Sequence, residues 1–190
     1  MSKTLPVNPR YGLPALSWSD VVVIEQDVDR WLRGIKFKNR AMEYGTHVHK
    51  LIEKGHLDVP RLGNPEQVYA ATIPTGRGKS VFMCVGKIDD SNDDTILDYK
   101  TCKTLWTQKQ AEEHDQLKVY AFLRWKATGK RPTKGMIVAL ETEPHEDSES
   151  HVLTGNMRVL TVQLKFKDLL KVQARFQHAY WKVLQYGLDQ

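Results

Sequence analysis

Three side chains near the middle of the sequence could carry out metal-assisted hydrolysis. Asp89 ends the segment Gly86-Lys87-Ile88-Asp89, and Asp98 and Lys100 follow nine and eleven residues later. Successive side chains of a strand point to opposite faces, so Asp98 and Lys100 would share one face. Two converging carboxylates are hard oxygen ligands for Mg²⁺ or Mn²⁺, and a lysine beside them can orient a water molecule. The set predicts a metal centre able to hydrolyse a phosphodiester.

The same residues have a structural alternative. Residues 89–94 could form a solvated turn, with Asp98 and Lys100 as an exposed ion pair, because a D-x-K triplet is common on its own. A metal centre requires Asp89 to lie near Asp98. We expect strands over residues 80–88 and 95–101 to achieve this by pairing as a hairpin across the polar turn 90–94.

Two further sets of residues recur at a spacing of four on predicted helices, where such residues stack along one face. Gly45, His49 and Glu53 fall on a helix predicted for residues 41–54. The glycine allows close approach of a backbone or a nucleic acid, and the histidine could bind metal or phosphate. Gln116 and Tyr120 fall on a helix predicted for residues 107–127 and could hold a phosphate or the lysine. Each set alone could equally pack against a core.

The elements that would position these side chains follow from apolar periodicity and from glycine and proline breaks. Residues 1–16 are expected to form an irregular N-terminal arm, and residues 17–190 a single domain. Helices are expected from Ser17 or Ser19 to Leu32 and over 41–54, 107–127 and 168–186, with a strand as the alternative over 21–24. Strands are expected over 69–73, 80–88, 95–101, 135–141 and 157–164, with an acidic loop over 143–150. The pattern predicts an α/β or α+β domain in which helices flank a central set of strands.

Taken together and in this order, four segments resemble a known pattern. The motifs of the RecB-type branch of the PD-(D/E)XK nucleases are similar to Gly45-x-x-x-His49, Gly86-x-x-Asp89, Asp98-Tyr99-Lys100-Thr101 and Gln116-x-x-x-Tyr120. This branch includes nuclease domains of bacterial recombination helicases, the CRISPR adaptation exonucleases and the mitochondrial genome maintenance exonuclease. The resemblance covers residues 17–123, and the ordered set is more specific than any single motif.

The resemblance implies a restriction-endonuclease-like core, with a central mixed β-sheet flanked by helices, and a role for each motif residue. The implied metal ligands for Mg²⁺ or Mn²⁺ are His49, Asp89, Asp98 and the backbone carbonyl of Tyr99. Lys100 would position the attacking water, and Gln116 and Tyr120 would support the phosphate end of the site. Glu53 is a candidate for support behind the ligands.

Candidate DNA contacts lie close to these motifs. Thr101 continues the Asp98 motif, and Lys103 and Lys109 follow it as candidate phosphate contacts. Trp106 could stack on an unpaired base; burial in the core is the alternative.

The composition bounds the class of protein. The 190 residues are 41% hydrophobic and 27% charged, as in soluble globular domains, and no run of about 18 apolar residues predicts a membrane span. A net charge of +5 is compatible with DNA as a partner. Cys84 and Cys102 are too few for the four ligands of the iron–sulfur cluster that several relatives hold, so no such cluster is expected. The expected location is the cytoplasm of a bacterial or phage-infected cell.

These observations predict a Mg²⁺- or Mn²⁺-dependent deoxyribonuclease. The preferred interpretation is an exonuclease on single-stranded or end-processed DNA in recombination, repair or phage DNA metabolism, and its exonuclease part rests on the resemblance that His49 carries. The alternatives are a structure-specific endonuclease and a subunit that binds DNA without cutting it. The sequence carries no helicase motor, so processive degradation would need a helicase, recombination or replication partner, or threading of a strand.

Overall fold

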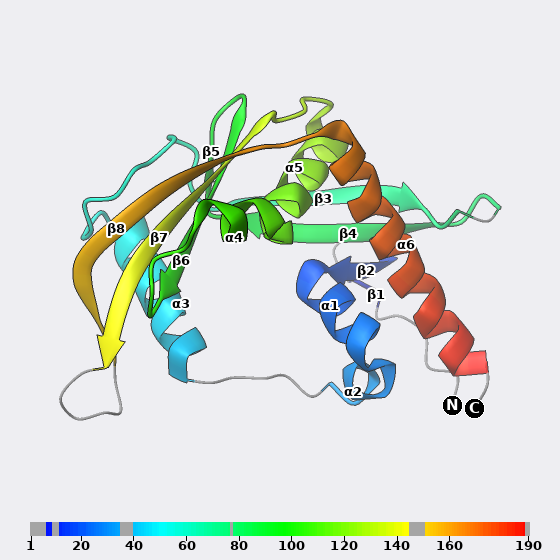
Figure 1. Ribbon diagram of the computed structural model, residues 1–190. Coiled ribbons are helices and arrows are strands. Elements are labelled where there is room, and N and C mark those ends of the chain that lie inside the picture. The colour runs from blue at the N-terminus through cyan, green and yellow to red at the C-terminus, as the bar shows by residue number, and fades with distance from the viewer. Residues whose placement is uncertain (1–6, 9–11, 35–39, 77, 145–150, 189–190) are drawn as a thin grey trace.

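Two four-stranded β-sheets, with helices between and around them, make up the computed structural model (Figure 1). The structure describes residues 7–8, 12–34, 40–76, 78–144 and 151–188. The predicted α/β class is confirmed, with two mixed sheets where one central mixed sheet was expected. Its strands are divided between two sheets.

The first sheet has the order β1-β2-β4-β3. It contains β1 (Val7–Asn8), β2 (Leu13–Ser17), β3 (Gln67–Pro74) and β4 (Val81–Ile88). β2 runs parallel to β4, whereas β3 and β4 form an antiparallel hairpin. The segment expected to be an irregular arm therefore contributes strands to this sheet, because Ala15, Leu16 and Ser17 pair with the edge of β4. Residues 1–6 and 9–11 of that arm lie outside the described residues.

The second sheet has the order β5-β6-β7-β8. It contains β5 (Asp90–Ser91), β6 (Thr95–Cys102), β7 (Lys134–Pro144) and β8 (His151–Gln163). The predicted hairpin between residues 80–88 and 95–101 is wrong. Both edges of β4 are occupied by β2 and β3, and both edges of β6 by β5 and β7. Of the predicted acidic loop, residues 143–144 belong to β7 and residues 145–150 lie outside the described residues.

The helices differ from the prediction at two breaks. The helix expected from residue 17 to Leu32 is split into α1 (Trp18–Gln26) and α2 (Val28–Leu32) by Asp27, whose extended backbone and side chain cap the second helix. The helix expected over 107–127 is split into α4 (Gln108–Glu113) and α5 (Asp115–Thr128) at His114, which is also extended. The remaining two, α3 (Arg40–Glu53) and α6 (Phe166–Leu188), lie close to their predicted ranges.

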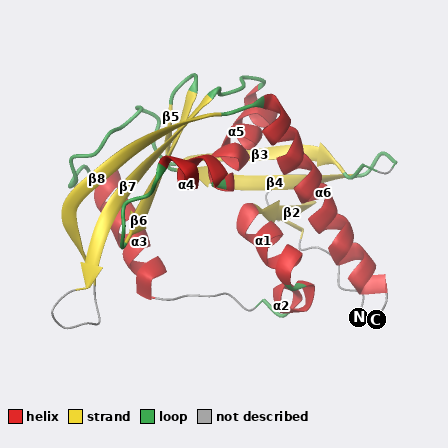
Figure 2. Cartoon of the chain, in the orientation of Figure 1, coloured by secondary structure: helices red, strands yellow, loops and turns green. Residues whose placement is uncertain are grey.

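Helix α5 is the centre of the molecule (Figure 2). It packs against β3 and β4 of the first sheet, β6 and β7 of the second, and α6. Its buried side chains include Leu117, Val119, Tyr120, Phe122 and Leu123. Two glycines allow the close packing, since a Cβ on Gly86 would lie 2.6 Å from Leu123 Cδ1 and one on Gly135 would lie 2.8 Å from Leu117 Cδ1. Helix α3 packs on β6, so side chains from α3, α5 and both sheets can meet near the end of β4.

Candidate metal centre and nucleic-acid cleft

Asp89 is the single residue between β4 and β5, where the chain passes from the first sheet to the second. Its Oδ2 accepts a hydrogen bond of 2.9 Å from the backbone N–H of Tyr99. This bond, in place of the predicted hairpin, brings Asp89 beside Asp98. The first carboxylate of the site therefore lies at the junction of the two sheets.

Asp98 and Lys100 share a face of β6, as the alternation of a strand predicts. Lys100 Nζ lies 3.2 Å from Asp98 Oδ1 and 2.9 Å from Oδ2, although only the contact with Oδ1 has hydrogen-bond geometry. Asp98 is completely buried, so the alternative of an exposed ion pair is wrong. Burial raises the pKa of the Asp98 carboxyl to about 7, against the opposing charge of Lys100. A further cation beside this carboxylate would lower its pKa.

His49 reaches the same place from α3. Its Nε2 lies 3.1 Å from the carbonyl oxygen of Tyr99, and its Nδ1 lies 3.6 Å from Asp89 Oδ1. Gly45, one turn earlier, lets α3 approach β6, because a Cβ there would lie 3.2 Å from Thr101 Oγ1.

The titration of His49 and Asp89 reflects their mutual contact. Burial opposes the charged ring, but the hydrogen bond and charge of Asp89 outweigh it and raise the pKa of His49. Burial likewise opposes the charged carboxylate of Asp89, but His49, the Tyr99 N–H and Lys100 together lower its pKa. The pair is an acid–base contact of the kind that perturbed functional sites contain.

Lys100 is also held from α5. Its Nζ donates a hydrogen bond of 2.7 Å to Gln116 Oε1, and Gln116 Nε2 contacts the hydroxyl of Tyr120. Burial raises the pKa of Tyr120, so its hydroxyl stays protonated. The spacing of four on the predicted helix thus places Gln116 and Tyr120 in one hydrogen-bonded chain that ends on the lysine.

Two residues near the site had no signal in the sequence. Glu66, in the turn before β3, has a carboxylate oxygen in a group with donor atoms of His49 and Asp89, all within 4.8 Å of one another. His114, at the break between α4 and α5, has its Nε2 3.8 Å from Asp98 Oδ2. Burial, followed by the charge of Lys100, lowers the pKa of His114 to about 4. Neither position belongs to a periodic sequence pattern, and only tertiary contacts bring the two residues to the site.

A cleft of about 800 Å³ runs along the site between α3 and the end of β6. Thr101 and Lys103, both predicted DNA contacts, line it, together with Glu53 and Lys87. Glu53 forms an ion pair with Lys87, with Glu53 Oε1 3.4 Å from Lys87 Nζ.

The other two predicted DNA contacts lie outside this cleft lining. Trp106 packs edge-on against His114, with ring centroids 5.0 Å apart. Lys109 Nζ lies 3.8 Å from Glu113 on the exposed side of α4. The indole of Trp106 therefore supports the back of the site, where the sequence left open burial or base stacking.

The donor set fits a hard divalent cation. Carboxylate oxygens and a backbone carbonyl are oxygen ligands that Mg²⁺ or Mn²⁺ accepts, and the imidazole of His49 adds a nitrogen ligand of the kind that transition metals favour. Three polar atoms around the site are buried and make no hydrogen bond among the described residues: Glu66 Oε2, Asp98 Oδ2 and His114 Nε2. Two of them lie against a lysine, Glu66 Oε2 against Lys87 and Asp98 Oδ2 against Lys100, as buried carboxylates need a cation beside them.

The arrangement of strands and helices matches solved structures of exonucleases. A predicted exonuclease from Eubacterium rectale gives a TM-score of 0.57 at 10% identity, covering 92% of this chain and 82% of that chain. A phage-related exonuclease from Haemophilus somnus 129PT gives 0.54 at 11% identity, covering 87% and 81%. The chain shares the fold of these proteins. No protein-family profile and no curated protein sequence matches the chain.

The shared fold agrees with the α/β arrangement that the sequence predicted. At these identities the likeness concerns the fold, and the roles of the site residues rest on their geometry. Among the described helices, none is long and apolar enough to cross a membrane.

Proposed function

We propose that the chain is a Mg²⁺- or Mn²⁺-dependent deoxyribonuclease of the RecB-type PD-(D/E)XK branch, acting as an exonuclease on single-stranded or end-processed DNA. The observation that carries the proposal is the convergence of Asp89, Asp98, Lys100 and His49 at the junction of two sheets, beside an open cleft. The fold shared with exonucleases supports it.

His49, Asp89 and Asp98 would hold the metal, together with the carbonyl oxygen of Tyr99. When bound, the metal supplies a Lewis acid for the scissile phosphate and lowers the pKa of a bound water. His49 already lies against both Asp89 and the Tyr99 carbonyl, so these proposed ligands from α3, β6 and the sheet junction lie close together.

Lys100 would orient the attacking water. Its ammonium group is fixed by the carboxylate of Asp98 on one side and the amide of Gln116 on the other. Two anchors hold the lysine in one geometry, which is what positioning a nucleophile requires. Thr101 and Lys103 then lie further along the same cleft, where a lysine attracts backbone phosphates.

The proposed substrate is DNA with a free end, and the proposed setting is cytoplasmic DNA recombination, repair or phage DNA metabolism. A helicase, recombination or replication protein is the proposed partner for processive degradation.

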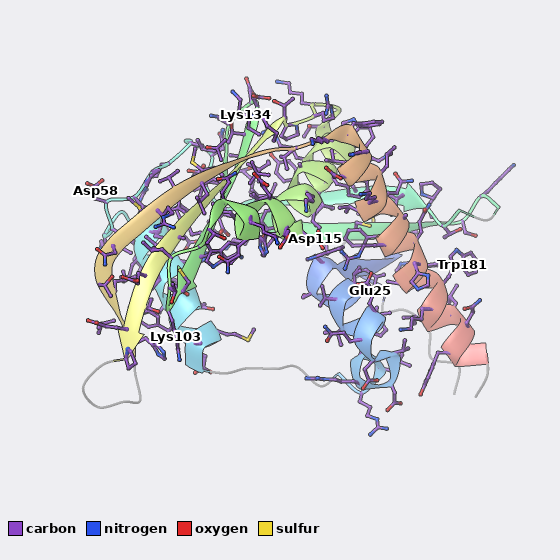
Figure 3. The ribbon with its side chains drawn as sticks, in the orientation of Figure 1. Glu25, Asp58, Lys103, Asp115, Lys134 and Trp181 are labelled. Carbon is purple, nitrogen blue, oxygen red and sulfur yellow. The ribbon has the colours of Figure 1, made fainter. Side chains whose placement is uncertain are left out.

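End-labelled linear single strands, linear duplex and covalently closed circles, each incubated with Mg²⁺, Mn²⁺ or EDTA, test the proposal. We expect metal-dependent loss of linear DNA only, with the label reporting polarity, and no loss with Lys100→Ala. Lys134→Ala is the matched control, since Lys134 pairs with Asp94 at the opposite end of the sheet from Lys103 (Figure 3).

Two outcomes would contradict the proposal. Nicking of circles would replace the exonuclease with a structure-specific endonuclease. A folded protein that binds DNA and cuts none of the substrates would be a DNA-binding subunit.

A further inference from the structure

Glu66 has an unusual backbone for its residue type. Among the described residues other than glycine, it alone has a positive φ, of 57°. Its N–H donates a hydrogen bond of 2.9 Å to the carbonyl oxygen of Asp89. The turn before β3 is thereby tied to the residue at the sheet junction, and the Glu66 side chain is directed to the proposed metal centre.

The carboxylate of Glu66 meets two kinds of partner. One oxygen belongs to the group with His49 and Asp89 whose donor atoms lie within 4.8 Å of one another. Oε2 is buried without a hydrogen bond and contacts the ammonium of Lys87. The same carboxylate therefore faces metal-ligating atoms and a lysine at once.

Lys87 has the position of a counter-ion that can leave. It precedes Asp89 by two residues on β4, and its Nζ lies between Glu66 and Glu53, 3.4 Å from the latter. Its side chain is 55% exposed, whereas that of Glu66 is 21% exposed. A long lysine stem can swing into water at little cost, while the glutamate is held by its backbone.

We propose that Glu66 is a further carboxylate ligand of the metal held by His49 and Asp89, and that Lys87 neutralises Glu66 until the metal binds. This inference rests on the metal centre of the proposed function. The lysine offers one charge and the divalent ion two, so the ion displaces the ammonium from the carboxylate. Lys87 then becomes free to meet the negative backbone of DNA in the same cleft, which it also lines.

Titration of Mn²⁺ into the metal-free protein, followed calorimetrically and without DNA, separates this proposal from catalysis. We expect Glu66→Gln to weaken Mn²⁺ binding by about 10-fold or more, the scale of losing a group that tunes a metal site. Lys87→Met should tighten binding several-fold in the native background. The gain should shrink in the Glu66→Gln background, because the lysine then has no ligand to withhold.

Two controls accompany these variants, one for the loss of a glutamate elsewhere and one for the loss of the fold. Glu113→Gln removes a glutamate that pairs with Lys109 outside the cleft, and should leave Mn²⁺ binding unchanged. Glu66→Asn keeps a residue that tolerates the left-handed backbone; it should retain the metal-free melting temperature and still lose Mn²⁺ affinity.

The two proposals fail in different ways. Unchanged Mn²⁺ affinity in Glu66→Gln, with binding abolished in Asp89→Asn, would overturn the role of Glu66 and leave the metal centre standing. Unchanged affinity in both variants would overturn the metal centre itself. Equal gains from Lys87→Met in both backgrounds would show a general charge effect and refute the counter-ion role.

Discussion

At the scale of single residues, Lys100 depends on partners from two different elements. Asp98 contacts it from the same strand, and Gln116 accepts its hydrogen bond from α5, with Tyr120 behind the amide. An ammonium group with one anchor could swing between orientations, whereas one with two anchors on different elements keeps a fixed direction. The precision of the lysine thus depends on a neutral glutamine as much as on a carboxylate.

Gln116→Ala should lower kcat by about 10- to 100-fold, the usual effect of losing a supporting partner at such a site. KM should change little, because Gln116 would act through the lysine. Tyr120→Phe removes only the hydroxyl that contacts Gln116. Tyr120 is the residue furthest from Lys100 in this series of hydrogen bonds, so this variant should lower kcat less. Steady-state digestion of a labelled single strand measures both. An unchanged kcat in Gln116→Ala would show that Asp98 alone orients Lys100.

Asp98 predicts a pH dependence of stability in the metal-free protein. Its folded-state pKa of about 7 lies above the ordinary value of 3.8, so the folded state holds this proton more tightly than the unfolded state. The stabilisation is fully present below about pH 4 and is lost as the pH rises through about 7. Asp98→Asn removes this dependence, so its Tm relative to the native protein should rise between about pH 4 and pH 7. Parallel Tm curves would contradict it.

Sequence spacing was sufficient to predict the shared faces of some candidate site residues, and it gave no information on others. Asp98 with Lys100, and Gln116 with Tyr120, lie at the periods of a strand and a helix, so their shared faces follow from local geometry. Glu66 lies in a turn, and the hydrogen bond to the Asp89 carbonyl is what brings it to the site. His114 reaches Asp98 only because the predicted helix breaks there. Local periodicity carries no information on either contact.

At the scale of elements, α5 carries two site residues and is seated by two glycines. Gly86 precedes Asp89 in its motif, and its lack of a side chain makes room for Leu123. Gly135 on β7 likewise makes room for Leu117. A Cβ added at Gly135 would meet the Cβ and Cγ of that leucine as well as its terminal methyl. The helix can therefore lie directly on both sheets.

Gly135→Ala should destabilise the protein by about 1–3 kcal/mol, the typical cost of overpacking a buried contact. Gly86→Ala should cost less, because its tightest contact is one terminal methyl of Leu123, which can turn aside. Urea unfolding followed by fluorescence compares the two variants. An equal or larger loss in Gly86→Ala would mean that Leu123 has no room to move.

The longer strands were predictable, whereas β1 and β2 in the expected arm and β5 in the expected turn were not. The partners of β6 were also not predictable. Residues 80–88 and 95–101 were expected to pair because they are neighbours in the sequence. In the structure β4 pairs with β2, which comes from residues 13–17. Strand β6 pairs with β7, which comes from residues 134–144. Alternating polarity identifies a strand, whereas the choice between distant partners depends on how whole layers pack.

At the scale of the whole molecule, Arg175 connects three helices. From α6 it donates hydrogen bonds of 2.8 and 2.6 Å to Glu25 on α1, and one of 2.5 Å to Asp115 on α5. Figure 3 labels Glu25 and Asp115 on their facing helices. The guanidinium also lies 4.4 Å from the centre of the Trp18 ring. The C-terminal helix is thereby bound to the N-terminal one and to the central one.

Arg175→Met should lower the free energy of unfolding by about 1 kcal/mol, because bidentate pairs are strong but this one is 36% exposed and partly screened. Arg33→Met is the matched control. Arg33 pairs with Asp29 on the surface of one helix, and its loss should change stability little. Chemical denaturation of both variants measures the difference. Equal effects would show that Arg175 contributes no more than an ordinary surface charge.

The position of Asp89 between two sheets has a consequence for when the proposed site can form during synthesis. The first sheet begins with β1 at residue 7, and the second is completed by β8, which ends at residue 163. The proposed ligands have their final spacing only when both sheets have closed around α5. We therefore expect a growing chain on the ribosome to have no nuclease activity until most of its length has emerged.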